Sequence, residues 1–470
     1  MLAPFAIEAG LGGVLVLVFV AGLLARGEDR RRIAWLATLG VLAVGILAAF
    51  ARPLGPALGG MFVQDGLAIF AKRLFLAATF IGLLAGLAPT DRVFARRAGE
   101  YHLLLLTSLL GMLVLASARD LILLFLAFEL MSIPLYVLAG FVKRDAGSVE
   151  ASLKFFLVGS VSSAVMAYGL SFVYGATGTT DLVRIAQAST ASNPLLTLGL
   201  IAALVGFAFK IAAVPFHMWV PDTYEAASTP FVAWLSVAPK AAGFVALFRV
   251  YFEGGGDRAA AWVPIAAFLA TVTMLAGNLM ALPQQNTKRL LAYSGIAQIG
   301  YMLVGVAAAS ASGTAMVLFY LVAYVFGNMG AFLVVEALAR AEGSEATTAF
   351  RGLAQRSPLL ALAMLLFLLS LGGIPFVAGF WAKLYVFWAA TERGLYWLVL
   401  LGAILTVVAL FYYLLVAKRM YIEPPDHPTR VPVAPTLALS LLLCALGVVI
   451  LGLYPKGVVM AALQVASPLF

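Results

Sequence analysis

The amino-acid sequence predicts an all-α protein that crosses a membrane many times. Hydrophobic residues make up 63% of its 470 residues and charged residues only 11%, whereas roughly a quarter of the residues in a soluble domain are charged. The mean hydropathy is +1.04. The apolar residues fall into runs of about 17–25, the length that a helix needs to cross ~30 Å of hydrocarbon. Together these observations indicate a polytopic helical membrane protein.

Fourteen such runs follow one another along the chain. They lie at 5–25, 33–51, 66–89, 101–118, 120–142, 152–175, 195–216, 229–252, 260–282, 290–310, 313–339, 358–391, 395–417 and 434–454. The twelfth is too long for one straight span and carries Gly372-Gly-Ile-Pro375. Because proline removes a backbone donor and breaks helices, we expect a broken helix there. Lys72 and Arg73 interrupt the third run, and we expect its first turns in the membrane interface.

The loops between these runs indicate how the chain is oriented. Most basic residues lie in the odd-numbered loops: Arg26, Arg30, Arg31, Arg32, Arg92, Arg96, Arg97, Lys143, Arg144, Lys154, Lys288, Arg289, Arg340, Arg351, Arg356, Lys418, Arg419 and Arg430. Since cytoplasmic loops are enriched in Lys and Arg, we expect the odd-numbered loops in the cytoplasm and both termini in the periplasm. The loop after the seventh span is an exception, because it has no basic residue and carries Asp222 and Glu225.

The overall charge and the single cysteine exclude other classes of partner and cofactor. The formal net charge is +9, and most of the basic residues lie in short loops, where they indicate topology and contact anionic lipids. No nucleic-acid partner is therefore expected. Cys444 is the only cysteine, so neither a disulfide within the chain nor a thiolate metal or iron–sulfur site is expected. The first apolar run lacks a basic start and a cleavage site, and we interpret it as a retained helix.

Two similar tripeptides suggest an internal repeat. Val214-Pro-Phe216 in the seventh span is echoed by Ile374-Pro-Phe376 in the twelfth, five helices later, and each has a lysine nearby, Lys210 and Lys383. An odd number of helices between equivalent positions indicates an inverted repeat, which places broken helices at the middle of the membrane in many transporters. Chance recurrence in so apolar a chain explains the echo equally well.

The charged residues deep within the spans are the candidates for chemistry. They are Glu129, Lys210, Lys240 and Lys383, and each such charge costs at least ~2.5–3.5 kcal/mol on insertion scales. A desolvated lysine loses proton affinity and regains it beside a carboxylate, so a Glu–Lys pair that opens and closes suits proton relay. The alternatives are a static ion pair for Glu129, lysines that reach an interface for Lys210 and Lys383, and a cap at the Pro239 kink for Lys240.

Other polar residues are candidates for supporting roles. His217 lies where the broken seventh span meets a loop, and it is either a structural hydrogen-bonding residue or a relay member. Tyr293, Ser294 and Gln298 follow one another along one helix, where they either order water or hydrogen-bond neighbouring helices. No nucleotide-binding motif, haem-ligand pair or cysteine cluster is present, so no cofactor is expected in this chain.

Several motifs in a fixed order resemble a known family. They are Glu129-Leu-Met-Ser-Ile-Pro-Leu-Tyr136, Ser148-Val-Glu-Ala-Ser-Leu-Lys-Phe155, 209–224 with its Val-Pro-Phe-His-Met-Trp core, 278–294 and Gly373-Ile-Pro-Phe-Val-Ala-Gly-Phe-Trp-Ala-Lys-Leu-Tyr385. Together they resemble the subunit N family of bacterial NADH-quinone oxidoreductase, respiratory complex I. The resemblance covers roughly residues 60 to 420 and extends more distantly to subunits L and M and to Mrp-type sodium/proton antiporters.

The resemblance implies an architecture and a set of roles. It implies fourteen helices with two inverted five-helix repeats and broken helices 7 and 12. The chain then divides into helices 1–3 (1–100), a first repeat (101–252), a second repeat (260–417) and a C-terminal loop and helix (418–470). Glu129 and Lys210 match a paired glutamate and lysine, Lys240 a central relay lysine, and Lys383 the lysine that exchanges protons with the outer side. Where related chains often have a histidine, this chain has Gln298, which cannot titrate.

The family also implies a function and partners. The chain is expected to be a proton-translocating, non-redox subunit of a bacterial inner-membrane NADH:quinone oxidoreductase. NADH, flavin, iron–sulfur clusters and quinone are expected in other subunits, and the antiporter-like subunit M, small membrane subunits and lipids are the expected partners. An Mrp-type sodium/proton antiporter subunit and a scaffold with immobile charges remain the alternatives.

Overall fold

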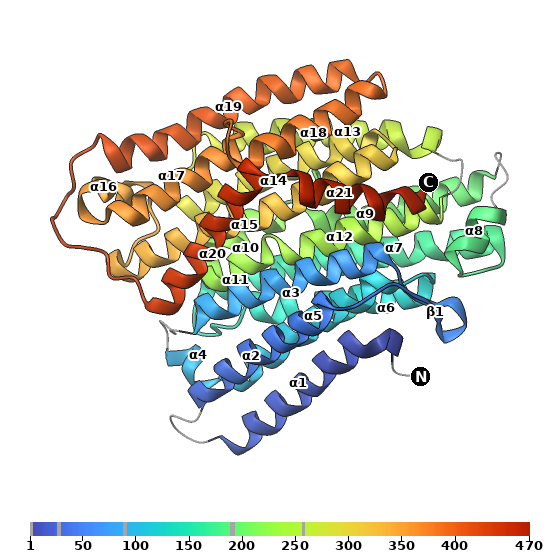
Figure 1. Ribbon diagram of the computed structural model, residues 1–470, viewed down its shortest axis with the longest axis horizontal. Helices are drawn as coiled ribbons and strands as arrows, with labels where there is room; N and C mark the ends of the chain where they lie inside the picture. Colours follow the sequence, from blue (N-terminus) through green and yellow to red (C-terminus); the bar gives the residue numbers. More distant parts are fainter. Residues whose placement is uncertain (1–2, 26–29, 88–91, 189–192, 256–258) are drawn as a thin grey trace.

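The computed structural model describes residues 3–25, 30–87, 92–188, 193–255 and 259–470. Figure 1 shows a bundle of long helices that run along its long axis. The N-terminal helices lie in its lower part and α18 and α19 at its top, and α20 and α21 return so that α21 crosses the middle. Both α20 and α21 pack against α3 and α15. The C-terminal helices therefore connect the two parts of the bundle.

The chain forms helices and one short hairpin. Up to residue 255 these are α1 (Ala6–Leu24), α2 (Arg30–Ala49), β1 (Leu54–Ala57), β2 (Phe62–Gln64), α3 (Gly66–Gly86), α4 (Arg92–Arg96), α5 (Ala98–Ser117), α6 (Leu121–Ala139), α7 (Ala146–Thr177), α8 (Leu182–Ala188), α9 (Pro194–Ile211), α10 (Trp219–Ala226), α11 (Thr229–Leu235), α12 (Ala238–Phe248) and a π-helix (Arg249–Glu253). The remainder forms α13 (Ala259–Ala281), α14 (Thr287–Ala307), α15 (Ala311–Glu342), α16 (Leu353–Arg356), α17 (Pro358–Gly372), α18 (Ala378–Glu392), α19 (Tyr396–Tyr421), α20 (Pro435–Leu453) and α21 (Lys456–Ala466). Short 3-10 turns occur at 3–5, 58–60, 347–350 and 467–469, and β1 pairs antiparallel with β2.

The predicted fold class is confirmed. Thirteen helical stretches within the described residues are long and apolar enough to cross a membrane, and each corresponds to one expected span. The twelfth expected span consists of the shorter helices α17 and α18. The sequence did not predict the β1–β2 hairpin, α8, α10 or the amphipathic helix α21, because such short elements lack the long apolar run on which the prediction rests.

The chain leaves the helical path at the two expected breaks. Helix α9 ends at Ile211, and Ala212 takes a left-handed conformation with φ of 67°. Helix α17 ends at Gly372, Gly373 has φ of 80°, and α18 begins at Ala378. Proline follows each break, at Pro215 and Pro375, and cannot continue the helix. Both breaks therefore free backbone carbonyls inside the bundle, which must find partners there.

Loops alternate between the two ends of the bundle. At the α4 end, Asp222 contacts Lys154 and Arg289, each at 2.8 Å, and Glu225 also contacts Arg289 at 2.8 Å. The loop after the seventh predicted span therefore lies with two of the basic loops, and its acidic residues neutralise them. Burial alone raises the pKa of Asp222, but the hydrogen bonds from Lys154 and Arg289 outweigh it and hold that pKa below its ordinary value.

The opposite end, where α8 and both chain termini lie (Figure 1), contains a buried ion network. Arg249 is fully buried and donates to Asp65 at 2.6 and 2.7 Å and to Glu253 at 2.9 Å, and Arg119 pairs with Glu253. Burying a charge without a partner is costly, so this network holds α3 and the end of α12 together.

Lys72 is buried within the bundle and has a partner of opposite charge. Its side chain is 0% exposed, and its Nζ lies 2.6 Å from Glu8 of α1. The sequence predicted an interfacial start of this span, because Lys72 and Arg73 interrupt its apolar run. The structure supplies one from a helix that begins 60 residues earlier.

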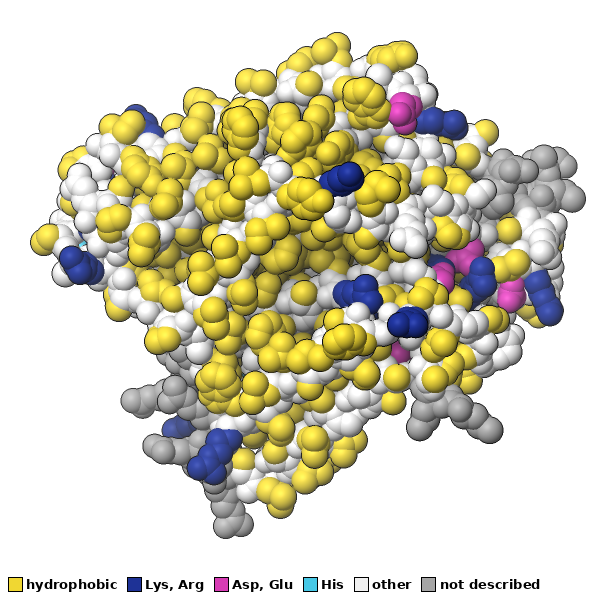
Figure 2. Space-filling model, in the orientation of Figure 1, with side chains coloured by type: hydrophobic (Ala, Val, Ile, Leu, Met, Phe, Trp, Pro, Cys, Tyr) yellow, Lys and Arg dark blue, Asp and Glu magenta, His cyan; other side chains and the backbone are white. Residues whose placement is uncertain are grey.

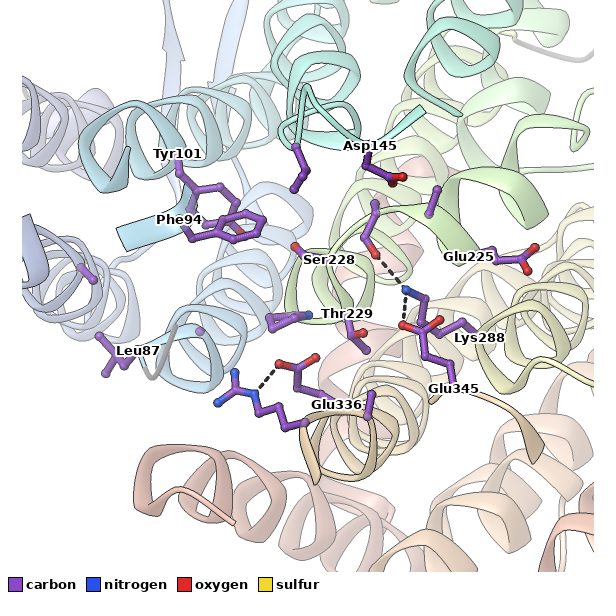
Figure 3. A pocket seen from close by; sticks show the side chains of 18 of the residues that line it. Leu87, Phe94, Tyr101, Asp145, Glu225, Ser228, Thr229, Lys288, Glu336 and Glu345 are labelled. Atoms are coloured by element: carbon purple, nitrogen blue, oxygen red, sulfur yellow. Dashed lines mark hydrogen bonds and ion pairs between the residues drawn. The ribbon is translucent and has the colours of Figure 1, made fainter. Parts of the chain in front are cut away.

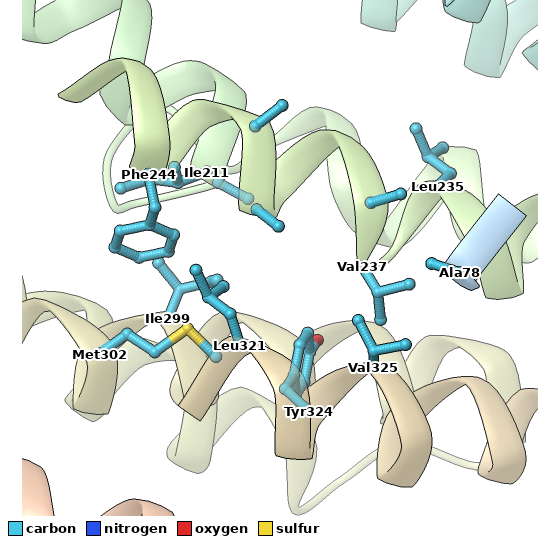
Figure 4. Close-up of a cluster of buried hydrophobic side chains, with 14 of the residues drawn as sticks. Ala78, Ile211, Leu235, Val237, Phe244, Ile299, Met302, Leu321, Tyr324 and Val325 are labelled. Atoms are coloured by element: carbon cyan, nitrogen blue, oxygen red, sulfur yellow. The ribbon is translucent and has the colours of Figure 1, made fainter. Parts of the chain in front are cut away.

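Apolar side chains cover both the outside and the interior. They occupy most of the face in Figure 2, where charged side chains are few, as expected for a surface against lipid. Inside, Phe244 and Val237 of the α11–α12 segment face Ile299 of α14 and Val325 of α15 (Figure 4). The polar groups described below are therefore set in an otherwise apolar interior.

Candidate functional site

The three candidate lysines lie inside the bundle on three different helices. Lys210 near the end of α9 is 2% exposed, Lys240 in α12 is 1% exposed and Lys383 in α18 is 4% exposed. The protein encloses all three side chains, which argues against the alternative that Lys210 and Lys383 extend to the membrane surface. Their ammonium groups must be stabilised by the protein or by water.

Lys210 contacts a hydroxyl and aromatic rings. Its Nζ donates to Ser132 Oγ at 2.6 Å and lies 4.9 Å from the ring centre of Phe128. Glu129 is on the same helix as Ser132, one turn away, and is only half-buried. Its Oε1 has no hydrogen-bond partner within the described part of the chain. The expected Glu129–Lys210 pair is thus near but open, with Ser132 holding the ammonium.

Side chains from outside α9 form hydrogen bonds with the backbone groups at the break after this helix. Trp219 Nε1 donates to the carbonyl of Phe209 at 3.3 Å, and the amide of Val214 donates to Thr273 Oγ1 at 3.0 Å. His217 lies in this irregular segment and is half-buried, and its Nδ1 has no partner among the described residues. The structure therefore places His217 beside the break, without a hydrogen bond to the three lysines among the described residues.

Lys240 lies at the crossing of α12 with α14 and α15. A Cβ built on Gly295 of α14 would meet Tyr324 Oη at 2.9 Å and Lys240 Nζ at 3.6 Å, so both groups face the space left by this glycine. Nζ also lies 5.4 Å from the ring centre of Tyr224. Within the described residues neither Nζ nor Tyr324 Oη has a hydrogen-bond partner. One turn along α12, a Cβ built on Gly243 would meet the Cγ of Lys210 at 3.1 Å, so the two lysines belong to neighbouring helices.

Helix α14 carries a chain of hydrogen bonds away from Lys240. Gln298 Nε2 donates to the carbonyl of Leu371 at 3.0 Å and to Tyr413 Oη at 3.2 Å, while Tyr320 Oη donates to Gln298 Oε1 at 2.6 Å. Ser294 Oγ lies 2.5 Å from Tyr413 Oη. Gln298 thus has a partner for both its amide nitrogen and its oxygen, and it joins α14 to α15, α17 and α19.

Lys383 lies at the other end of this chain. Its Nζ donates to the carbonyl of Gly372 at 3.3 Å and lies 4.5 Å from the ring centre of Tyr301. The first contact satisfies a carbonyl that the end of α17 leaves free, and a cation is favoured at that helix terminus. Tyr301 Oη in turn accepts a hydrogen bond from Asn278 at 3.3 Å. Gln298 and Tyr301 are one turn apart, so α14 connects the surroundings of Lys240 with Lys383.

Tyr293 does not join this chain of hydrogen bonds. Its ring lies 6.0 Å from the guanidinium carbon of Arg289, toward the α4 end. Of the three candidates expected along this helix, Ser294 and Gln298 therefore take part in the network and Tyr293 does not.

A cavity of about 490 Å³ opens at the α4 end. Figure 3 shows Phe94 and Tyr101 on one side of it and Lys288 with Glu345 on the other, and Ser228 and Thr229 lie between them. Its charged lining residues are Asp145, Glu225, Lys288, Glu336, Arg340 and Glu345. Acidic side chains thus outnumber basic ones.

Comparison with known proteins decides the family. Residues 118–409 match the family described as NADH:quinone oxidoreductase/Mrp antiporter, transmembrane. The chain is 45% identical to NADH-quinone oxidoreductase subunit N of Moorella thermoacetica, over 99% of this chain and 97% of that protein. The chain belongs to the subunit N family of NADH-quinone oxidoreductases. The subunit N of Heliobacterium modesticaldum is 41% identical, over 96% of this chain and 95% of its own length.

Solved structures share the fold. A chain of respiratory complex I from Thermus thermophilus with bound aureothin is 33% identical, with a TM-score of 0.83 over 97% of this chain and 99% of that one. A chain of the Mrp complex from Dietzia superposes with a TM-score of 0.88 at 21% identity, over 100% of this chain and 98% of that one. At that identity the second likeness shows the fold alone.

Within this subunit N chain, sequence reasoning found the lysines but not what surrounds them. It did not identify the hydroxyl-bearing residues around them, which are Ser132, Tyr224, Tyr324 and Tyr413. Such residues are common in apolar helices, and most of them serve only to pack against neighbouring helices. Only Ser132 offered a usable signal in the sequence, because it follows the candidate residue Glu129 by one turn of the same helix. No group of three or more His, Cys, Asp or Glu side chains that could hold a metal ion occurs in the described ranges.

Proposed function

We propose that this chain is a proton-translocating, non-redox membrane-arm subunit of a bacterial NADH:quinone oxidoreductase. Membership of the subunit N family supports the assignment to the complex. The observation that carries the proton-translocating role is the series of buried lysines, Lys210, Lys240 and Lys383, in neighbouring helices of an apolar interior. Buried ionisable groups are costly in a membrane and are usually functional, and a lysine that is desolvated gains and loses a proton readily.

The relay begins at Glu129, which we assign as its input. Glu129 is half-buried and shares α6 with exposed apolar side chains, among them Leu126 (60%) and Ile133 (55%), a surface that suits a neighbouring membrane subunit. A change in that neighbour would alter the field at Glu129. When the carboxylate approaches Lys210, the ammonium is stabilised; when it withdraws and Ser132 remains the partner, Lys210 releases its proton more easily.

The proton then passes through Lys240 to Lys383. The hydroxyls of Tyr324, Tyr413 and Ser294 support a path along α14, because each hydroxyl can accept one proton and release another. Gln298 cannot titrate, and we assign it to holding a water molecule and the neighbouring hydroxyls in place. Lys383 delivers the proton to the outer side.

The remaining assignments follow from the same proposal. NADH oxidation, flavin, iron–sulfur clusters and quinone reduction belong to other subunits of the complex. The antiporter-like subunit M and small membrane subunits are the proposed neighbours, and lipids cover the apolar surface. The basic loops orient the α4 end toward the cytoplasm and both termini toward the periplasm of a bacterial inner membrane. We also propose two inverted five-helix repeats, at 101–252 and 260–417. The similar breaks after α9 and α17, one in each repeat, support this proposal.

Replacing Glu129 by Gln tests the input of the relay. The amide keeps the shape of the side chain but removes the charge that stabilises protonated Lys210. We expect NADH:quinone turnover and proton pumping to fall together by roughly tenfold, the equivalent of about 1.4 kcal/mol in a barrier. The measurement uses membranes that carry the intact complex, with assembly checked by native gel.

Glu150→Gln is the matched control, since Glu150 is 66% exposed and forms an ion pair with Lys154 on its own helix. Its turnover and pumping should equal those of the unmodified complex. A Glu129→Gln complex that assembles and pumps at the unmodified rate would remove Glu129 from the mechanism.

A further inference from the structure

The orientation of α18, the helix that carries Lys383, is not set by a continuous helix. Helix α17 ends at Gly372, α18 begins at Ala378, and the backbone between them is irregular. In an unbroken helix, the hydrogen bonds between successive turns would fix the rotation of one half relative to the other. Because those bonds are interrupted here, the rotation of α18 depends on its contacts with neighbouring elements.

Three backbones meet at this break. A Cβ built on Gly379 of α18 would overlap the carbonyl oxygen of Ser370 of α17, and the amide of Gly379 donates to Ser370 Oγ at 3.1 Å. A Cβ built on Gly452, the next-to-last residue of α20, would meet Val377 Cα at 2.6 Å. Glycine permits such a close approach of two backbones. The end of α20 therefore lies directly against the break.

One hydrogen bond joins the start of α18 to the end of α20. Trp381 Nε1 donates to the carbonyl oxygen of Gly452 at 2.8 Å. This carbonyl is among the last four of α20, which have no partner within their own helix. A backbone carbonyl without a donor is costly at membrane depth, so the bond is favoured. It opposes rotation of α18 away from α20.

The contact with α20 also supports a strained backbone. Phe376 has φ of 72°, in the left-handed region that residues other than glycine rarely adopt, and its ring is 79% exposed. Such conformations persist where the surrounding structure holds them, and they cluster at functional sites. A Cβ built on Gly452 would overlap the carbonyl oxygen of Phe376, so α20 lies against this backbone. Displacing α20 would allow the break to relax.

The contacts of Lys383 depend on the rotation of α18. Its Nζ donates to the carbonyl of Gly372 at 3.3 Å and lies 4.5 Å from the ring centre of Tyr301. A Cβ built on Gly373 would meet Lys383 Cδ at 3.0 Å, so the lysine stem passes close to this glycine. Residues two apart on a helix are separated by about 200° around its axis. Trp381 therefore holds one side of α18 while Lys383 extends from the other.

We propose that Trp381 is a positioning residue for proton transfer at Lys383, and that it acts by tying α18 to the end of α20 at Gly452. This inference rests on the proposed function. Trp381 does not carry the proton, because its N–H remains bonded to the carbonyl of Gly452. The C-terminal helix α20 thus takes part in the relay indirectly. It holds the broken helix in the conformation that places the ammonium of Lys383 between Gly372 and Tyr301.

Two substitutions of Trp381 separate the hydrogen bond from packing. Trp381→Phe keeps an aromatic ring but removes the N–H, whereas a neutral histidine in Trp381→His keeps an N–H at the corresponding ring position but removes the six-membered ring. In membranes with the intact complex, we expect Trp381→Phe to lower pumping and kcat per assembled complex roughly fivefold, as for the loss of one hydrogen bond. Trp381→His should retain more activity than Trp381→Phe, whereas a packing role predicts the reverse order.

The KM values provide a second readout for these complexes. NADH and quinone bind in other subunits under the proposed function, so their KM values should stay unchanged while kcat falls. Trp388→Phe is the matched control, because the indole of Trp388 is 64% exposed and donates to Glu392 on the same helix. Its loss leaves the attachment of α18 to α20 intact, and kcat and pumping should equal those of the unmodified complex.

Substitution of Gly452 tests the other side of the contact. The methyl group of Gly452→Ala pushes α20 away from the break, and we expect kcat and pumping to fall roughly tenfold or more, because small displacements of a reacting group are costly. Gly457→Ala is the control, since a Cβ there would come no closer than 4.0 Å to Tyr454. It should leave both rates unchanged.

The outcomes distinguish the positioning role from the relay itself. A normal kcat in the assembled Trp381→Phe complex, or higher activity in Trp381→Phe than in Trp381→His, would overturn the proposal. So would faster thermal inactivation with an unchanged kcat per assembled complex, which would make Trp381 structural only. Lys383→Met is measured in parallel: its loss of pumping beside a normal Trp381→Phe complex refutes the positioning role alone, whereas normal pumping in Lys383→Met refutes the proposed relay.

Discussion

Replacing Lys240 by Met is expected to lower NADH:quinone turnover and proton pumping together by roughly a hundredfold or more, the contribution of a positioned proton-transfer group. Met fills the volume of the lysine stem with an apolar side chain, so packing around the 1% exposed site is kept. The relay is interrupted because the methionine side chain can neither accept nor release a proton at the crossing of α12 with α14 and α15. Turnover and pumping should be measured in membranes, with assembly followed by native gel.

Lys240→Arg distinguishes a relay from a scaffold. Arginine keeps the positive charge but does not release its proton in proteins, so a relay should fail with Arg as with Met. A scaffold that needs only a cation at this position would tolerate Arg. Lys143→Met, at an exposed position, is the control and should leave both rates unchanged. Full activity of an assembled Lys240→Arg complex would contradict the relay.

Replacing Lys383 by Met is the second change with a large expected effect. We expect a loss of pumping of roughly a hundredfold, because Lys383 is the last buried lysine on the path and the chain along α14 ends at Tyr301 beside it. The substitution also removes the contact to the carbonyl of Gly372, so some loss of stability is expected. Purified complex should therefore be compared for both pumping and thermal inactivation.

Lys383→Arg separates these two effects. A guanidinium can still contact the free carbonyls at the end of α17, so stability should return toward that of the unmodified complex while pumping stays low. Recovery of pumping along with stability in the Arg complex would show that Lys383 acts only as a helix cap.

The sequence predicted most of the fold because burying polar or charged side chains in a membrane is costly, so membrane-spanning segments consist almost entirely of apolar residues. Runs of apolar residues marked the spans, and prolines near Lys210 and Lys383 marked the breaks. The same cost made the lysines conspicuous. Lys72 shows the limit: its partner Glu8 is distant in sequence, so its charge was interpreted as an interruption of the helix and not as one half of a buried pair.

The surroundings of the lysines were less predictable for a physical reason. The roles of Tyr324, Tyr413 and Asn328 depend on the groups that they face. Hydroxyls in helices can also form hydrogen bonds with their own helix, so the sequence alone does not show which of them reach a neighbouring helix. A kink at Pro239 was named only as an alternative for Lys240, and the break between α11 and α12 lies just before that proline in an otherwise continuous apolar run. Which helices meet, and therefore which hydroxyls meet, depends on packing that periodicity does not encode.

The measurement that tests the central claim most directly is proton pumping alongside NADH:quinone turnover in membranes that carry the intact complex with Lys210→Ala. Lys210 donates a hydrogen bond to Ser132, one turn from the input carboxylate Glu129, and its replacement leaves Glu129 and Ser132 in place. If the buried lysines form one coupled path, both pumping and turnover should be lost while native gels show an assembled complex. Unchanged pumping and turnover in the assembled complex would contradict the account.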